Sequence, residues 1–175
     1  MLKIMRERLK LLRLLSLAIA VLLPYGMAGC HSKPQKATTV ILIRHAERDN
    51  FFNLTNLGRK HAAALVDAVG DMDLAAIYSP NLERCLDTVT PLANHLGITI
   101  TLTPRISKES ADTVIGEMLA THAGQAVLVV AHGSGNLRAL HQRLGGVGDG
   151  PYRYGELYIY TIPAYGPVTV VKRRY

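Results

Sequence analysis

Arg44 and His45 stand side by side directly after an apolar run, residues 40–43. Such a run indicates a buried strand, and ligands of open α/β sheets bind beyond the carboxyl ends of the strands. A guanidinium offers a planar fork of donors that fits phosphate, and an imidazole can be a nucleophile or carry a proton near neutral pH. The pair therefore predicts an anion site, provided that other segments supply partners.

Two further segments supply such partners. A second apolar run, residues 127–130, also leads to an imidazole, that of His132. Ser79 and Pro80 suit the cap and first position of a helix, which would place Arg84 on its first turn, where anions are attracted. Two guanidiniums and two imidazoles without a carboxylate cluster describe an anion pocket, and phosphate suits it best.

Strand and helix patterns alternate from residue 39 onward and position these side chains. The expected strands are residues 39–43, 75–78, 98–102, 126–131, 158–162 and 168–172, and the expected helices are residues 55–69, 79–96, 111–121 and 136–144. Thr55 is the expected cap of the first helix, Leu57 one of its apolar positions, and Pro91 should kink the second helix. Because the runs at 40–43 and 127–130 are continuously apolar, their strands should be buried on both faces. The sequence therefore predicts a single three-layer α/β/α domain with a mainly parallel central sheet, spanning residues 39–175.

The first 29 residues have the layout of a signal peptide: a basic start, a short apolar stretch and small residues. Met27-Ala28-Gly29-Cys30 resembles a bacterial lipobox, although Met replaces the more usual Leu, which predicts lipidation of Cys30 and a polar tether at residues 30–38. Such a protein would be anchored in the cell envelope, facing the periplasm or the exterior. Residues 1–29 hold five Lys/Arg and one Glu, so residues 30–175 keep +3 of the chain's +7. That charge does not favour a nucleic-acid partner.

Four blocks of the sequence, in this order, resemble the histidine phosphatase superfamily, also called the phosphoglycerate-mutase-like family. They are Arg44-His45-Ala46-Glu47, Leu54-Thr55-x-x-Gly58-Arg59, Ile77-Tyr78-Ser79-Pro80 with Arg84 and Thr88, and Val129-Val130-Ala131-His132-Gly133. The first block departs from the family pattern, in which glycine is commoner than alanine after the histidine. The resemblance spans essentially all of residues 39–174 and implies the phosphoglycerate-mutase-like fold.

The resemblance also implies an activity. The protein would be a phosphatase that hydrolyses a small phosphomonoester, or phosphohistidine, through a covalent phosphohistidine intermediate on His45. Arg44, Arg84 and His132 would hold the phosphate oxygens and neutralise the charge of the transition state. Neither a metal nor another cofactor is needed for this chemistry.

The donor of a proton to the leaving group stays open. Many relatives carry a Glu or Asp after the third strand, and this chain offers Glu109 and Asp112 there. Glu109 is the preferred candidate, although the Gly and Trp landmarks that often follow the family's Glu are missing. Both carboxylates suit surface or helix-capping roles equally well, and compact relatives that act on good leaving groups lack the donor.

Rival interpretations rest on fewer residues. A tethered domain could bind a phosphorylated ligand without turnover, but retention of both His45 and His132 favours catalysis. A mutase is disfavoured because phosphoglycerate mutases carry extra segments around the sugar-acid site. Residues 133–138 resemble a dinucleotide fingerprint, but Arg138 stands where that motif has its third glycine. Residues 129–135 resemble the oxyanion segment of an α/β-hydrolase, but the nucleophile elbow that such an enzyme needs does not follow.

The other reactive side chains have ordinary expected places. Four histidines, His61, His95, His122 and His141, are expected at the surface, and no zinc-type spacing occurs. Cys85 is expected to be a small buried apolar residue. Phe51, Phe52, Tyr152 and Tyr154 suit a pocket rim, ordinary packing or a membrane-proximal position. The sequence leaves the substrate and the oligomeric state open.

Overall fold

The computed structural model describes residues 36–104 and 110–175. Its strands are β1 Thr38–Arg44, β2 Leu74–Pro80, β3 Ile100–Thr103, β4 Ala126–Ala131, β5 Glu156–Ile162 and β6 Thr169–Arg174, and its helices are α2 Asn56–Val69, α3 Glu83–Leu96, α4 Ala111–Thr121 and α5 Ser134–Arg143. The predicted signal peptide (residues 1–29), Cys30 and Glu109 lie outside the described residues. Within these ranges, no helix has the length and apolar character needed to cross a bilayer.

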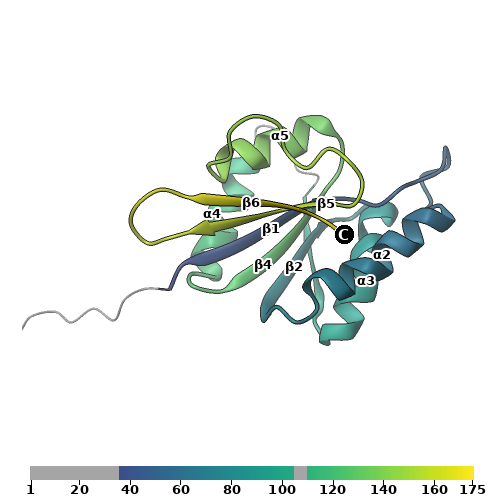
Figure 1. The fold of residues 1–175 in the computed structure, drawn as a ribbon, viewed down its shortest axis with the longest axis horizontal. Helices are drawn as coiled ribbons and strands as arrows, with labels where there is room; N and C mark the ends of the chain where they lie inside the picture. Colours follow the sequence, from purple (N-terminus) through teal and green to yellow (C-terminus); the bar gives the residue numbers. More distant parts are fainter. Residues whose placement is uncertain (1–35, 105–109) are drawn as a thin grey trace, which may run out of the picture. The chain divides into compact units, whose positions relative to one another are not determined.

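The strands form one six-stranded sheet in the order β3-β2-β4-β1-β5-β6 (Figure 1). β1, β2, β3 and β4 run parallel to one another, while β5 runs antiparallel to both of its neighbours, β1 and β6. The central pair, β1 and β4, supplies the two continuously apolar runs. The sheet is therefore mainly parallel, as predicted, with an antiparallel pair added at one edge.

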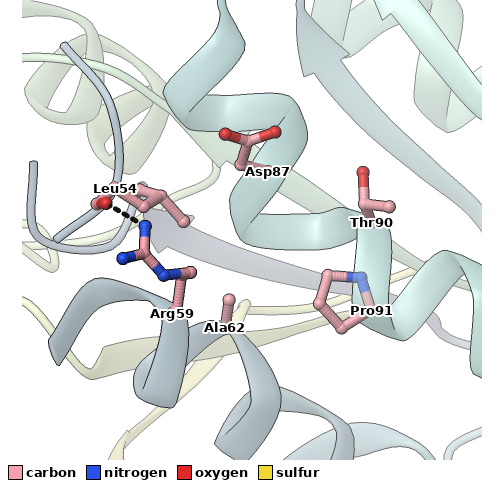
Figure 2. A pocket seen from close by; sticks show the side chains of 6 residues that line it. All are labelled: Leu54, Arg59, Ala62, Asp87, Thr90 and Pro91. Carbon is pink, nitrogen blue, oxygen red and sulfur yellow. Dashed lines mark hydrogen bonds between the residues drawn. The ribbon is translucent and has the colours of Figure 1, made fainter. Parts of the chain in front are cut away.

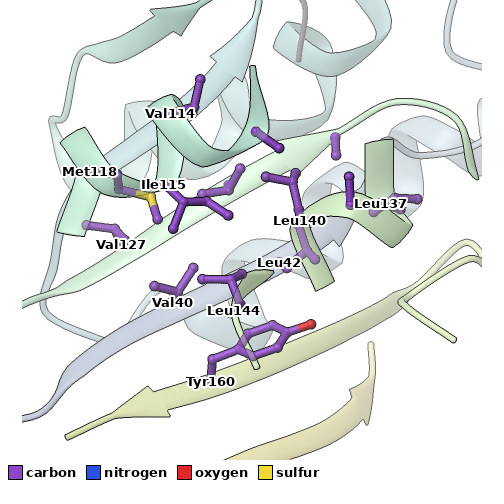
Figure 3. Packing of buried hydrophobic residues seen from close by; sticks show 14 of the residues in the cluster. Val40, Leu42, Val114, Ile115, Met118, Val127, Leu137, Leu140, Leu144 and Tyr160 are labelled. Atoms are coloured by element: carbon purple, nitrogen blue, oxygen red, sulfur yellow. The ribbon is translucent and has the colours of Figure 1, made fainter. Parts of the chain in front are cut away.

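Different helices cover the two faces of the sheet. Val40 and Leu42 of β1 point to one face and pack with α4 and α5, whereas Ile41 and Ile43 point to the other and pack with α2 and α3. Figure 3 shows the first of these clusters, which includes Ile115, Met118, Leu137, Leu140, Leu144 and Tyr160. All four β1 side chains are fully buried. This burial on both faces confirms the three-layer architecture.

The second strand is longer than the sequence suggests. Ser79 and Pro80 were expected to begin a helix, but they pair with Leu102 and Thr103 of β3. The helix α3 begins after Leu82, which occupies its N-cap without a side-chain hydrogen bond. That prediction was wrong because a Ser-Pro pair suits a helix start locally, whereas its strand pairing depends on a distant segment.

Helix α2 matches its predicted bounds and its predicted cap. The Thr55 hydroxyl accepts a hydrogen bond from the Gly58 N–H (3.0 Å). Leu57 was expected on the apolar face but is 52% exposed, so that part of the prediction was wrong. In α3 the helix continues through Pro91 and ends at Gly97, whose φ of +66° is left-handed.

Candidate active site

The ends of β1 and β4 bring the two predicted imidazoles to neighbouring positions. The strands pair in parallel with Arg44 opposite Ala131, so His45 and His132 each follow directly after a paired residue. The His45 N–H extends the pairing by donating to the Ala131 carbonyl (3.1 Å). Both residues therefore leave the sheet at the same edge, beyond the carboxyl ends of its central strands.

His45 is held in a form that suits a nucleophile. Its side chain is buried, and its Nδ1 lies 2.8 Å from the Ala46 carbonyl oxygen, which can only accept. Nδ1 is therefore the donor, and the lone pair of the neutral ring is on Nε2. Burial lowers the pKa of His45 to about 4, with further lowering by Arg84, Arg44 and Arg48 against a raising effect of the Ala46 hydrogen bond. His45 is thus neutral at physiological pH.

Two guanidiniums flank this imidazole. Arg44 donates from one terminal nitrogen to the Tyr152 carbonyl (2.6 Å). The Nε atoms of Arg44 and Arg84 are both buried and have no hydrogen-bond partner among the described residues. Buried donors are normally satisfied, so these two N–H groups fit an anion that approaches His45.

Helix N-termini add to the positive character of the site. Arg84 is the second residue of α3, whose N-cap is Leu82, and α5 begins after its N-cap Gly133, whose φ is +70°. Neither N-cap residue makes a side-chain capping hydrogen bond. The amide groups of such uncapped first turns attract anions.

Thr88 ties α3 to the loop that carries the imidazole. Its hydroxyl accepts a hydrogen bond from the Ala46 N–H (2.9 Å) and donates to the Arg84 carbonyl (2.6 Å). The side chain is fully buried. Through this one hydroxyl, the residue after His45 and the backbone of Arg84 are fixed to each other. The sequence offered Thr88 only as part of a resemblance, because its hydrogen bond with Ala46 joins residues that are 42 positions apart.

His132 has a local hydrogen-bond partner. Its Nε2 lies 2.9 Å from Nδ2 of Asn136, which belongs to the first turn of α5. An amide nitrogen can only donate, so Nε2 of His132 accepts and its ring proton is on Nδ1. This pairing fixes the ring beside the end of β4.

Aromatic rings lie on three of the arginines. The guanidinium carbon of Arg44 is 4.4 Å from the ring centroid of Tyr154, which is itself 5.9 Å from the ring centroid of His45. The guanidinium carbons of Arg48 and Arg84 lie 4.6 and 5.4 Å from the ring centroid of Phe52. Of the three roles that the sequence left open for Phe52 and Tyr154, these contacts favour the pocket rim.

Of the two candidate proton donors, only Asp112 lies among the described residues, and it is not part of this cluster. Glu109 lies outside the described residues. Asp112 occupies the first turn of α4, its side chain is 70% exposed, and it forms an ion pair with Arg143. The nearby acid Glu47 pairs with His61, with 2.6 Å between Oε2 and Nδ1.

A pocket outside this cluster lies between α2 and α3. Its volume is about 310 Å³. Figure 2 shows its lining residues, which are Leu54, Arg59, Ala62, Asp87, Thr90 and Pro91. None of the four predicted phosphate-site residues lines it. Arg59 points across it and donates to the Leu54 carbonyl (2.6 Å). This pocket is therefore not the predicted anion site.

Cys85 and His141 are both buried, and the sequence predicts this correctly for Cys85 alone. Cys85 is fully buried, as predicted, and burial raises the pKa of its thiol to about 12. His141 was expected at the surface but is fully buried, with its Nδ1 2.6 Å from the Tyr160 hydroxyl oxygen. That prediction was wrong because the loop after α5 folds over the ring, and Gly146 lies directly against it. Among the described residues, no group of three or more His, Cys, Asp or Glu side chains is arranged to hold a metal.

Comparison with known proteins agrees with the fold and with the first three of the four sequence blocks. A family model described as the histidine phosphatase superfamily (branch 1) matches residues 40–108. No curated protein matches the sequence. One similar solved structure is Bacillus stearothermophilus YhfR, with 21% identity over 77% of this chain and 96% of that chain and a TM-score of 0.64. A second is mycobacterial glucosyl-3-phosphoglycerate phosphatase, with 15% identity over 78% of this chain and 97% of that chain and a TM-score of 0.63. A third is the protein histidine phosphatase SixA complexed with tungstate, with 15% identity over 78% of this chain and 96% of that chain and a TM-score of 0.59. These structures share the fold, and with the family match they support the histidine phosphatase superfamily.

Proposed function

We propose that the protein is a phosphatase that hydrolyses a phosphomonoester, or phosphohistidine, through a phosphohistidine intermediate on His45. One observation carries the proposal: a buried, neutral imidazole whose Nε2 bears the lone pair stands beside two guanidiniums with unsatisfied buried N–H groups. Nucleophile and charge-stabilising donors are the two components that phosphoryl transfer requires.

In the first step, Nε2 of His45 attacks phosphorus in line with the ester oxygen. The N–P bond forms while the P–O bond to the leaving group breaks, and the leaving oxygen takes up a proton. Arg44, Arg84 and His132 bind the three equatorial oxygens, whose charge the guanidiniums neutralise. The Ala46 carbonyl accepts from Nδ1 throughout and steadies the positive charge that develops on the ring.

In the second step, water attacks the same phosphorus. The N–P bond breaks, its electron pair returns to Nε2, and inorganic phosphate leaves. The proton lost by the water passes to the group that protonated the leaving oxygen, which restores the starting enzyme. The same residues serve both steps because the phosphoryl oxygens stay in place.

A rapid-quench experiment tests the intermediate. After mixing with ³²P-labelled substrate, we expect label on the protein within one turnover, stable in alkali and lost in acid, as for a phosphoramidate. Peptide mapping should place the label on the peptide that contains His45. Turnover without a labelled protein, or label on another residue, would contradict the mechanism. Phosphate binding with neither label nor turnover would instead favour the non-catalytic alternative.

For the proton donor we propose Glu109. We expect Glu109→Gln to lower kcat for alkyl phosphates by about 10²- to 10⁴-fold, because an alkoxide is a poor leaving group without a proton. For 4-nitrophenyl phosphate the loss should be small, because nitrophenolate leaves without protonation. Steady-state kcat with both substrates measures the difference.

Asp112→Asn is the matched control for this experiment, because the two acids are three residues apart. Asp112 already pairs with Arg143, so its amide variant should keep the activity of the wild type towards both esters. If Asp112→Asn, and not Glu109→Gln, lost the alkyl activity selectively, the assignment of the donor would be wrong.

A further inference from the structure

Two aromatic rings from distant loops lie on the arginines of the proposed site. Phe52 belongs to the loop between β1 and α2, and Tyr154 belongs to the loop between α5 and β5. Phe52 lies over Arg48 and Arg84, and Tyr154 lies over Arg44 and beside His45. The phosphate pocket therefore has an aromatic component that the phosphoryl chemistry does not use.

The conformation of Phe52 is costly and is held by a built turn. Its φ is +72°, a left-handed value that a bulky residue rarely adopts. The Asp49 carboxylate accepts from the N–H groups of Phe51 (2.8 Å) and Asn53 (3.0 Å), and the Asp49 N–H donates to the Asn53 carbonyl (2.8 Å). Strain that the surroundings maintain in this way is typical of binding sites.

The Phe52 ring keeps surface available for a ligand. The residue is 52% exposed although the guanidiniums of Arg48 and Arg84 lie against it. The neighbouring Phe51 is 83% exposed and lies outside the ring contacts of the described residues. The turn thus directs one phenylalanine toward the arginines and the other into solvent.

Tyr154 is held in place by contacts of the segment between α5 and β5. Arg44 donates to the carbonyl of Tyr152, two residues earlier, and Arg138 donates to the Tyr152 hydroxyl (3.2 Å). The Tyr154 ring is tilted 50° to that of His45. Its position beside both the nucleophile and a phosphate-binding arginine puts it within reach of whatever is attached to the phosphoryl group.

We infer that the preferred substrates are phosphomonoesters with an aromatic ring close to the phosphate, packed against Phe52 and Tyr154. The inference rests on the proposed function and narrows its substrate class. The leaving group is attached to the phosphoryl oxygens' own phosphorus, and the rings of Tyr154 and Phe52 contact Arg44 and Arg84, the two arginines proposed to hold those oxygens. A planar ring can stack there in offset or edge-on geometry and loses little conformational freedom, whereas a saturated chain gains only dispersion contacts.

A matched pair of substrates isolates the ring. Benzyl phosphate and cyclohexylmethyl phosphate are alike in size and in the acidity of their alcohols, and they differ in the π face. We expect the wild type to favour benzyl phosphate in kcat/KM, and Phe52→Leu to reduce that preference by about three- to tenfold. Phe51→Leu, the adjacent and more exposed position, should keep the wild-type preference. Tyr154→Leu provides a second variant with the same expected shift.

Each outcome decides the matter. A preference for benzyl phosphate that survives both Phe52→Leu and Tyr154→Leu would overturn the inference. So would an equal loss of activity towards both esters, because the rings would then serve only to hold the arginines. Hydrolysis of neither ester, with no labelled intermediate, would remove the proposed function itself. The effect of Glu109→Gln depends on the acidity of the leaving alcohol, which is alike in benzyl phosphate and cyclohexylmethyl phosphate. The loss of the proton donor and the loss of the aromatic contact can therefore be measured separately.

Discussion

Replacing His45 by glutamine is expected to lower kcat for phosphate release by on the order of 10⁴-fold or more, as removal of a covalent nucleophile commonly does. Glutamine is neutral, like His45 at its lowered pKa of about 4, so the charge of the pocket stays the same. Its amide nitrogen has no lone pair available for attack on phosphorus. The loss should therefore fall on kcat, and the labelled intermediate should disappear with it.

Binding separates this outcome from misfolding. Arg44 and Arg84 keep their buried donors in His45→Gln, so inorganic phosphate should still protect the variant against thermal unfolding. His95→Gln, a change at an exposed histidine of the same helix as Arg84, is the control and should keep the kcat of the wild type. Substantial turnover by a folded His45→Gln variant would refute the nucleophile assignment.

The sequence predicts best what depends on one strand end or one helix end. The continuous apolar run before His45 is sufficient to indicate a strand buried on both faces, and β1 and β4 are indeed neighbours. Thr55 is a strong capping residue next to a clear helical pattern, so the start of α2 is correct. The proximity of His45 and His132 follows because both leave parallel strands at the same edge.

What the sequence does not predict depends on contacts between distant segments. Phe52 and Tyr154 are about 100 residues apart, and only the folded loops place both rings on the arginines of one site. The extension of β2 through Pro80 depends on its pairing with β3. The burial of His141 depends on the later loop that covers it. In each case the partner residue is absent from the local pattern.

Gly58→Ala is expected to destabilise the protein by about 1–3 kcal/mol, the usual cost of forcing extra atoms into a packed site. A Cβ on Gly58 would lie 2.1 Å from the Glu47 carbonyl oxygen and 3.1 Å from its carbonyl carbon, which are backbone atoms. The same carbonyl accepts from the Thr55 N–H (2.9 Å), so the start of α2 rests directly on the chain two residues after His45. The clash must therefore move the loop that carries the proposed nucleophile.

A second effect on activity follows from that displacement. A shift of about 1 Å at a reacting group can cost roughly 10²-fold in rate, so kcat/KM of Gly58→Ala should fall as well as stability. Gly116→Ala is the matched control, because Gly116 is also helical but has open space around its Cβ position. Alanine is the better helix former by up to about 1 kcal/mol, so Gly116→Ala should be as stable as the wild type or more stable. Urea unfolding of both variants measures the difference, and a Gly58→Ala protein as stable as Gly116→Ala would show that the close approach of α2 to Glu47 does not constrain the site.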